Sequence, residues 1–315
     1  MNKTQLLDIA ESILTQPTAP FHEDAVRAEI RRQLTGLDGV DVEQDDFGNL
    51  IARYQRGAGE PKFAFVAHMD HPGYVGKEFL GGLPERYRQP RPPTVDYGAF
   101  SMLDLPAFDV RDGRIYSRAC DDLIGCTAIV AAFHDLVQSR REGSCLGIFT
   151  RAEEIGFVGA IQLAKSRTLP ENIILISLEA SNQNAGTAKM GEGVILRVGD
   201  KTSIFDSVST LQIASVAQGR DIPHQRSLMQ GGSCEATAFQ VYGYRAAALC
   251  VAIGNYHNQG EGDKVDAEYV SVDDTLGMAL LCSALAQASD LPDPLQTLRD
   301  AFDQRCEKYR PYFLN

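Results

Sequence analysis

Five short segments of this sequence carry carboxylate or imidazole side chains at or just beyond the end of an apolar run. These segments are His68–Asp70, Asp121–Asp122, Glu153–Glu154, Glu179 and His257. Imidazole nitrogens and carboxylate oxygens are the donors that zinc and similar divalent ions use in proteins. Each segment alone would suit an ordinary solvated strand end or helix start. Together they predict a hydrolytic site in which a pair of metal ions activates water.

The first two segments indicate how the ions would be held. His68 directly follows the apolar run 63–67, and a neutral imidazole there suits a metal. Asp70 is two residues further on, where its carboxylate would accept the other ring N–H and fix the tautomer of His68. Asp121 and Asp122 open a helix. A carboxylate held rigidly at that position could bridge two ions with its two oxygens.

The other three segments would complete the site. In the pair Glu153 and Glu154, one carboxylate would ligate a metal while its neighbour takes a proton from water. Glu179 ends a strand that is almost wholly apolar, where a charge is costly unless it is paired or bound to metal. His257 lies just past another apolar strand.

The elements that must position these residues alternate along the chain. Apolar periodicity predicts helices over 4–15, 22–35, 123–137, 157–164, 235–242 and 271–288, and strands over 50–54, 62–67, 145–150, 172–178, 194–198 and 246–253. This alternation predicts an α/β fold, with a central, mostly parallel mixed sheet and helices on both faces. In such sheets, sites gather beyond the carboxyl ends of the strands, which is where the five segments lie.

Residues 72–118 differ in character from the rest. They hold six of the fourteen prolines, many tyrosines and arginines, and no helical periodicity. We interpret them as a small inserted β or irregular domain. The catalytic domain would then comprise residues 1–71 and 119–315.

Composition limits the classes of partner. The chain has 315 residues, 44% of them hydrophobic, and a formal net charge of −12. The acidic balance argues against nucleic acid and anionic membranes as partners. No apolar run approaches the ~20 residues of a membrane span, and the first residues lack the basic start and apolar core of a signal peptide. Seven scattered cysteines without a CxxC pair favour reduced thiols and a cytoplasmic protein.

The order and local sequence of these segments resemble the glutamyl aminopeptidases and tetrahedral aminopeptidases of the di-metal aminopeptidase clan. The resemblance covers most of the chain outside 72–118. Its motifs are Ala19–Glu23, Asp46–Ala52, Ala67–Asp70, Asp121–Gly125, Glu153–Ala160, Gly231–Ala236 and Tyr256–His257. It implies release of N-terminal residues from small peptides, and a homo-oligomer.

The resemblance also implies the role of each site residue. One ion would be held by His68, Asp121 and Glu179, and the other by Asp121, Glu154 and His257. Glu153 would be the general base that draws a proton from the metal-activated water. The peptide bond after Asp121 would be cis. The ions are expected to be zinc, with cobalt or manganese as alternatives that the same donors suit.

The sequence departs from the family pattern at three points. Glu179 stands where the family usually has Asp, and His71 stands where it has Glu. The insertion at 72–118 is shorter than usual, which leaves the size of the oligomer open. His71, Glu235 and His224 are the candidates for contact with the substrate.

Two other functions remain open on sequence grounds. One is a deacylase or carboxypeptidase-like hydrolase of the same clan acting on N-acyl amino acids. Such enzymes commonly carry a lid of a hundred or so residues between the positions of Glu179 and His257, and only 77 residues separate them here. The other is a non-catalytic, metal-stabilised binding protein, which would have no need of Glu153.

Overall fold

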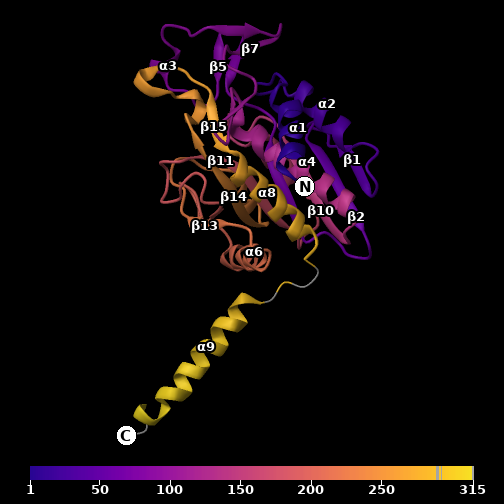
Figure 1. Cartoon of the computed structure of the whole chain (residues 1–315), viewed down its shortest axis with the longest axis vertical. Coiled ribbons are helices and arrows are strands. Elements are labelled where there is room, and N and C mark those ends of the chain that lie inside the picture. The colour runs from indigo at the N-terminus through magenta and orange to yellow at the C-terminus, as the bar shows by residue number, and fades with distance from the viewer. Residues whose placement is uncertain (289–290, 292, 314–315) are drawn as a thin grey trace.

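The computed structural model describes residues 1–288, 291 and 293–313 (Figure 1). Its helices are α1 (Lys3–Leu14), α2 (Asp24–Leu34), α3 (Glu85–Arg88), α4 (Cys120–Ser139), α5 (Val158–Ser166), α6 (Ser207–Gly219), α7 (Glu235–Val241), α8 (Val272–Ala286), α9 (Pro294–Tyr309) and the short 3-10 turns η1 (Tyr256–Asn258), η2 (Glu261–Asp263) and η3 (Arg310–Phe313). Its strands are β1 (Val40–Gln44), β2 (Leu50–Arg56), β3 (Phe63–His68), β4 (Gly73–Val75), β5 (Glu78–Leu80), β6 (Thr94–Asp96), β7 (Phe100–Leu103), β8 (Asp109–Arg111), β9 (Arg114–Ser117), β10 (Gly143–Thr150), β11 (Ile174–Asn182), β12 (Val194–Arg197), β13 (His224–Ser227), β14 (Arg245–Gly254) and β15 (Glu268–Ser271).

The main sheet is mixed, with a parallel centre. Its strands run in the order β1-β2-β10-β3-β11-β14-β15-β9-β8, and β12 and β13 continue from β14 on a side branch. The four central strands β10, β3, β11 and β14 are mutually parallel, whereas β1, β2, β15, β9 and β8 pair antiparallel. The predicted α/β class with a mostly parallel centre is therefore confirmed.

Helices cover both faces of this sheet. Strand β3 is therefore buried on both faces, which explains its continuous apolar sequence. Phe63, Phe65 and Ala67 enter the core under α1, α2, α4 and α8. Ala64 and Val66 enter the core on the opposite face, under α5 and α7. A strand buried on both faces needs a continuous apolar run instead of alternating polar and apolar residues. The charged residue can then come only at the end of the run.

The stretch 72–118 divides between two sheets. Strands β4 to β7 form a separate four-stranded sheet in the order β5-β4-β7-β6, which lies at the upper end of the molecule in Figure 1. Strands β8 and β9 instead join the main sheet through β15. We therefore propose that the inserted unit ends before Asp109, and that residues 109–118 belong to the catalytic domain.

Outside 72–118, five of the α-helices and strands were not predicted, namely α6, α9, β1, β13 and β15. Helix α6 has only a weak apolar periodicity, and its start depends on the Asp206 side chain, which accepts the N–H of Ser209. Strand β15 is short and precedes α8 without a break. Helix α9 is mostly polar. Within the described residues, no helix is long and apolar enough to cross a membrane.

Candidate metal centre

The parallel strands bring four of the five segments to one edge of the sheet. His68 is the last residue of β3 and pairs with Thr150 at the end of β10. Glu153 and Glu154 follow β10, and His257 follows β14. Glu179 does not end its strand as predicted, because β11 continues past it to Asn182. Because the carboxyl ends of parallel strands meet at one edge, residues that lie far apart in the sequence become neighbours.

Asp121 lies between the two histidines. Its Oδ1 is 3.6 Å from Nε2 of His68, and its Oδ2 is 3.4 Å from Nε2 of His257. Oε2 of Glu154 is 3.3 Å from the same nitrogen of His257. Each oxygen of Asp121 thus faces a different imidazole, as a carboxylate shared by two ions would.

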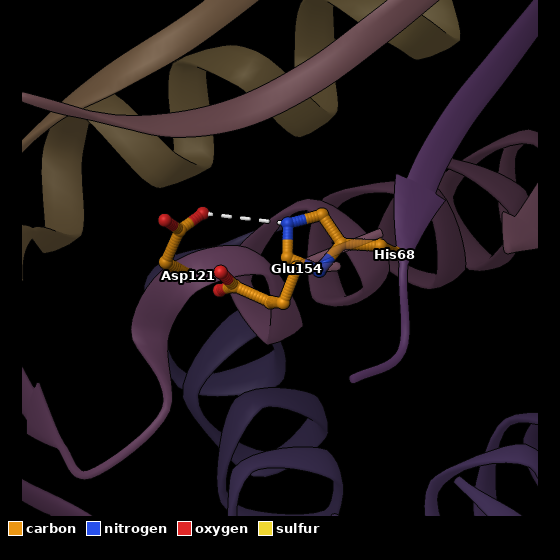
Figure 2. Close-up of side chains that lie close together, drawn as sticks. All are labelled: His68, Asp121 and Glu154. Atoms are coloured by element: carbon orange, nitrogen blue, oxygen red, sulfur yellow. Dashed lines mark ion pairs between the residues drawn. The ribbon is translucent and has the colours of Figure 1, made fainter. Parts of the chain in front are cut away.

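Two observations indicate that these donor atoms suit a metal ion. One donor atom from each of His68, Asp121 and Glu154 lies within 4.8 Å of the others, and Figure 2 shows these side chains converging. Oδ1 of Asp121 and Oε1 of Glu154 are buried and accept no hydrogen bond from any described residue. Buried acceptors without donors are costly, and a cation would satisfy them.

His68, His257 and Asp121 shift one another's pKa values. Burial by itself would lower the pKa of His68, but Glu153 and Asp121 outweigh it and hold that pKa well above its usual value. The same balance raises the pKa of His257, where Glu154 and Asp121 oppose burial. Burial would raise the pKa of Asp121, but its contacts with His257 and His68 keep it low.

Four other carboxyls in and around the site have raised pKa values. Burial raises the pKa of Glu179 to about 8, and those of Asp70 and Glu235 to about 7. Burial, with Glu179 and Glu154 nearby, also raises the pKa of Glu153 well above its usual value. So many carboxylates in a buried space repel one another, and bound cations would offset that repulsion.

The turn that carries Glu153 is fixed by two buried acids. Glu23 forms an ion pair with Arg151 at 2.7 Å and accepts the N–H of Ala152 at 3.0 Å, which holds Ala152 at a left-handed φ of 53°. Asp70 then accepts the main-chain N–H groups of Glu153 and Glu154, at 2.9 and 3.1 Å.

This placement corrects the role predicted for the Asp70 side chain. Nδ1 of His68 lies 3.0 Å from the main-chain carbonyl of Asp70, whereas the carboxylate of Asp70 is 3.7 Å away. The carbonyl therefore accepts the ring N–H and fixes the tautomer. The carboxylate turns towards the next strand because two main-chain donors converge there.

Glu268 is a site residue that sequence reasoning missed. It is fully buried on β15, and its carboxylate accepts the N–H of Asp121 at 3.0 Å and the N–H of His257 at 2.7 Å. A single acid thus connects two of the predicted ligands. The available signal was its place beside apolar Ala267 and Val270, where a charge needs a partner. The Asp121–Asp122 peptide bond is cis, as the resemblance implies.

The loop after β14 holds His257 by local contacts. Asn255, His257 and Asn258 all have left-handed φ angles, between 53° and 59°, a region in which asparagine is favoured among residues other than glycine. The side chain of Asn255 donates to the carbonyl of Ala267 at 2.8 Å. The ring of Tyr256 stacks on that of His257, with centroids 3.9 Å apart.

Glu179 lies at the side of the centre. Its Oε1 accepts a hydrogen bond from Ser177 at 3.1 Å. Glu179 and Asp121 line a small cavity of about 30 Å³ together with Arg197 and Tyr256. A larger hollow of about 460 Å³ lies at the opposite end of the strands, beside Lys62, and is remote from this chemistry.

The three candidates for substrate contact have different surroundings. His71 is buried, with Nδ1 2.6 Å from the carbonyl of Asp121 and Nε2 3.1 Å from Oδ1 of Asn258, so the structure favours a positioning role over contact with substrate. Glu235 is buried at the start of α7, and its charge acts on Glu153 and Glu179. His224 lies on β13, where its Nδ1 is 2.9 Å from the carbonyl of Ile222. No contact within the described chain joins His224 to the centre.

Comparison with known protein families identifies the family of this chain. The model of the M42 glutamyl aminopeptidase family matches residues 92–290, more than half of the chain. The chain belongs to the M42 glutamyl aminopeptidase family. Among curated proteins, FrvX of Escherichia coli (strain K12) is 25% identical to this M42 chain over 226 residues, which is 62% of the chain and 62% of FrvX. The chain thus spans less than two thirds of the length of that relative.

Solved structures share the fold of this M42 chain. The Pyrococcus horikoshii TET1 peptidase, described as assembling into a tetrahedron or a large octahedral shell, has a TM-score of 0.73 at 23% identity, over 89% of this chain and 99% of that one. The aminopeptidase APDkam598 of the archaeon Desulfurococcus kamchatkensis has a TM-score of 0.75 at 18% identity, over 91% and 96% of the two chains.

Proposed function

We propose that this M42 protein is an aminopeptidase with two divalent metal ions, which releases N-terminal residues from small peptides. The observation that carries the proposal is the position of Asp121, whose two oxygens face His68 at 3.6 Å and His257 at 3.4 Å. One ion between each pair would make Asp121 the bridging ligand. Membership of the family supports a peptidase over the other hydrolases considered.

The donors divide into two sets. His68, Asp121 and Glu179 would hold one ion, and Asp121, Glu154 and His257 the other. The mixture of imidazole nitrogen and carboxylate oxygen favours zinc and also suits cobalt or manganese. When bound, such ions lower the pKa of water towards ~7 and polarise a carbonyl group.

Glu153 is the proposed general base. Its Oε2 lies 3.8 Å from Nε2 of His68, and Asp70 fixes its main-chain N–H at 2.9 Å, so the carboxyl borders the centre without joining either set. Burial raises its pKa without metal, and neighbouring positive charge would lower it again. The carboxylate would then accept the proton of the attacking water and pass it to the leaving amine.

Other parts of the proposal rest on analogy. A further structure of similar fold is described as a dodecamer of PhTET1-12s, and the Pyrococcus horikoshii TET1 peptidase is described as forming larger shells. These descriptions support a homo-oligomer here. Small peptides are the proposed partners, with no role for nucleic acid or membranes. Cytoplasmic location stays a prediction from the sequence.

The proposed activity is tested with paired substrates. A panel of aminoacyl p-nitroanilides and their N-acetylated versions would be incubated with protein that has been chelated and then resupplied with zinc, cobalt or manganese. The proposal expects metal-dependent cleavage of the free-amine compounds alone. Cleavage of the acetylated compounds alone would assign a deacylase, and metal binding without cleavage across the panel would favour a binding protein.

A further inference from the structure

Helix α9 exposes three large apolar side chains, those of Leu298, Phe302 and Tyr309, which no other described element covers. It follows α8 and is capped by Asp293, whose side chain accepts the N–H of Leu295 at 2.9 Å. Figure 1 shows α9 standing apart from the body of the molecule, although it approaches α6. Gln296 and all residues from 298 to 313 are exposed. The match to the M42 family ends at residue 290, before this helix begins.

The exposed apolar residues share one face of α9. Leu298, Phe302 and Tyr309 are 43%, 54% and 46% exposed. Their spacings of four and seven residues place them on a single stripe, and Cys306 falls on the same stripe. An isolated helix of this length is marginal in water, and a row of large apolar side chains marks an interaction surface. We therefore expect this stripe to pack against another protein surface.

The charges of α9 indicate which partner. Its first half, residues 293–301, has a net negative charge, with Asp293 and Asp300 against Arg299. Its second half, residues 302–310, has a net positive charge, with Arg305, Lys308 and Arg310 against Asp303 and Glu307. This order suits the helix dipole. It also makes the helix complementary to a copy of itself that runs in the opposite direction.

We propose that α9 pairs antiparallel with α9 of a second copy of this chain, about a twofold axis at Phe302. Such an interface is self-complementary, as twofold interfaces must be. With Phe302 at the centre, helical geometry places Leu298 opposite the partner's Cys306. It also places Arg299 next to the partner's Asp303, and Asp303 next to the partner's Arg299.

The charged side chains of α9 can leave their partners within the helix and pair with those of a second α9. Nη1 of Arg299 contacts Asp293 at 3.3 Å and Gln296 at 2.9 Å, both in exposed positions. Exposed ion pairs contribute little to stability, so Arg299 can change partners at small cost. Binding to a different protein would not require the two halves of α9 to carry opposite net charges.

Cross-linking of the full chain tests the direction of pairing. Cys306 is exposed, and the other six of the seven cysteines are buried. A disulfide needs Cα atoms within about 7 Å, so the L298C variant should give at least about tenfold more cross-linked dimer under copper–phenanthroline than wild type. The L298C/C306S variant should lose the dimer. Efficient cross-linking of wild type would mean parallel pairing, and no cross-linking of L298C would mean no pairing; either result overturns the proposal.

A mixing experiment tests the charges between chains. In the L298C background, R299D places like negative charges across the interface and D303R places like positive charges there. Each variant alone should lose most of the dimer, and an equimolar mixture should recover it, because each chain then meets the opposite charge. Effects within one helix cannot produce recovery on mixing. Equal cross-linking of each variant alone and of the mixture would overturn the proposed register.

Discussion

The carboxylate of Glu268 accepts the main-chain N–H of Asp121 at 3.0 Å, and its other oxygen holds the N–H of His257 at 2.7 Å. Glu268 comes from a strand that contributes no proposed ligand. It connects the start of α4 to the loop after β14, and so sets the distance between the carboxylate of Asp121 and the imidazole of His257. Asp70 likewise fixes the positions of Glu153 and Glu154 by accepting their main-chain N–H groups.

Replacing Glu268 with Gln should weaken metal binding. The amide NH₂ cannot accept a hydrogen bond, so one buried main-chain N–H would lose its partner, at a cost of about 1–3 kcal/mol. Residues that orient metal ligands typically affect affinity by about 10- to 100-fold. Zinc titration by calorimetry would measure the change, with exposed Glu261→Gln as the control. Unchanged affinity in Glu268→Gln would show that this contact is dispensable.

Replacing Glu153 with Gln should abolish turnover while metal remains bound. General-base catalysis contributes about 10²- to 10⁴-fold, so hydrolysis of an aminoacyl p-nitroanilide should fall by at least two orders of magnitude. Metal content would be measured on the same sample, with exposed Glu171→Gln as the control. Retained activity would contradict the assignment of Glu153.

Replacing Gly82 with Ala should disturb His257. A Cβ atom at Gly82 would lie 2.5 Å from Nδ1 and 2.6 Å from Cε1 of that ring, so the ring or the loop must move. We expect metal affinity to fall about tenfold or more, because a displaced ligand leaves its donor misaligned. Gly59→Ala is a matched control, since a Cβ there meets no atom within 4 Å. Equal affinities in the two variants would mean that the loop adapts freely.

The metal-free protein should lose stability as the pH rises from about 5 to 8. Burial raises the pKa of Glu179 to about 8, and those of Asp70 and Glu235 to about 7. In the unfolded chain these carboxyls titrate near 4. The folded state therefore holds more protons in this interval, and its free energy of unfolding falls as those protons leave. The raised pKa values of His68 and His257 act in the same direction.

Chemical denaturation at several pH values would measure this slope, with and without zinc. Metal must displace protons from the histidines, so zinc should stabilise more strongly at pH 8 than at pH 5.5. A metal-free protein that is more stable at pH 8 would contradict the electrostatic account of the site.

The central strands and their terminal residues were predictable for a physical reason. Strands such as β3 are buried on both faces, so an apolar run followed by His68 marks both the strand and its functional end. Asp121 was recognisable because it opens a helix beside a second acid. In these segments the local sequence carries the information about position.

Contacts made across the fold were not predictable. Glu268 acts through two main-chain groups more than 10 and 140 residues away, and no local pattern records that pairing. Gly82 matters because it lies against His257, which depends on how the small sheet packs. The 72–118 stretch was divided between two sheets by the pairing of β9 with β15, a contact across 150 residues or more.

The most direct test of a two-metal centre bridged by Asp121 is a zinc titration of the metal-free protein, in which bound zinc and p-nitroanilide hydrolysis are followed together. The account predicts two ions per wild-type chain and activity that rises with the ions, and an Asp121→Asn variant that binds fewer ions and is inactive. A wild-type protein fully active with one ion, or an Asp121→Asn variant that binds both ions and turns over normally, would contradict it.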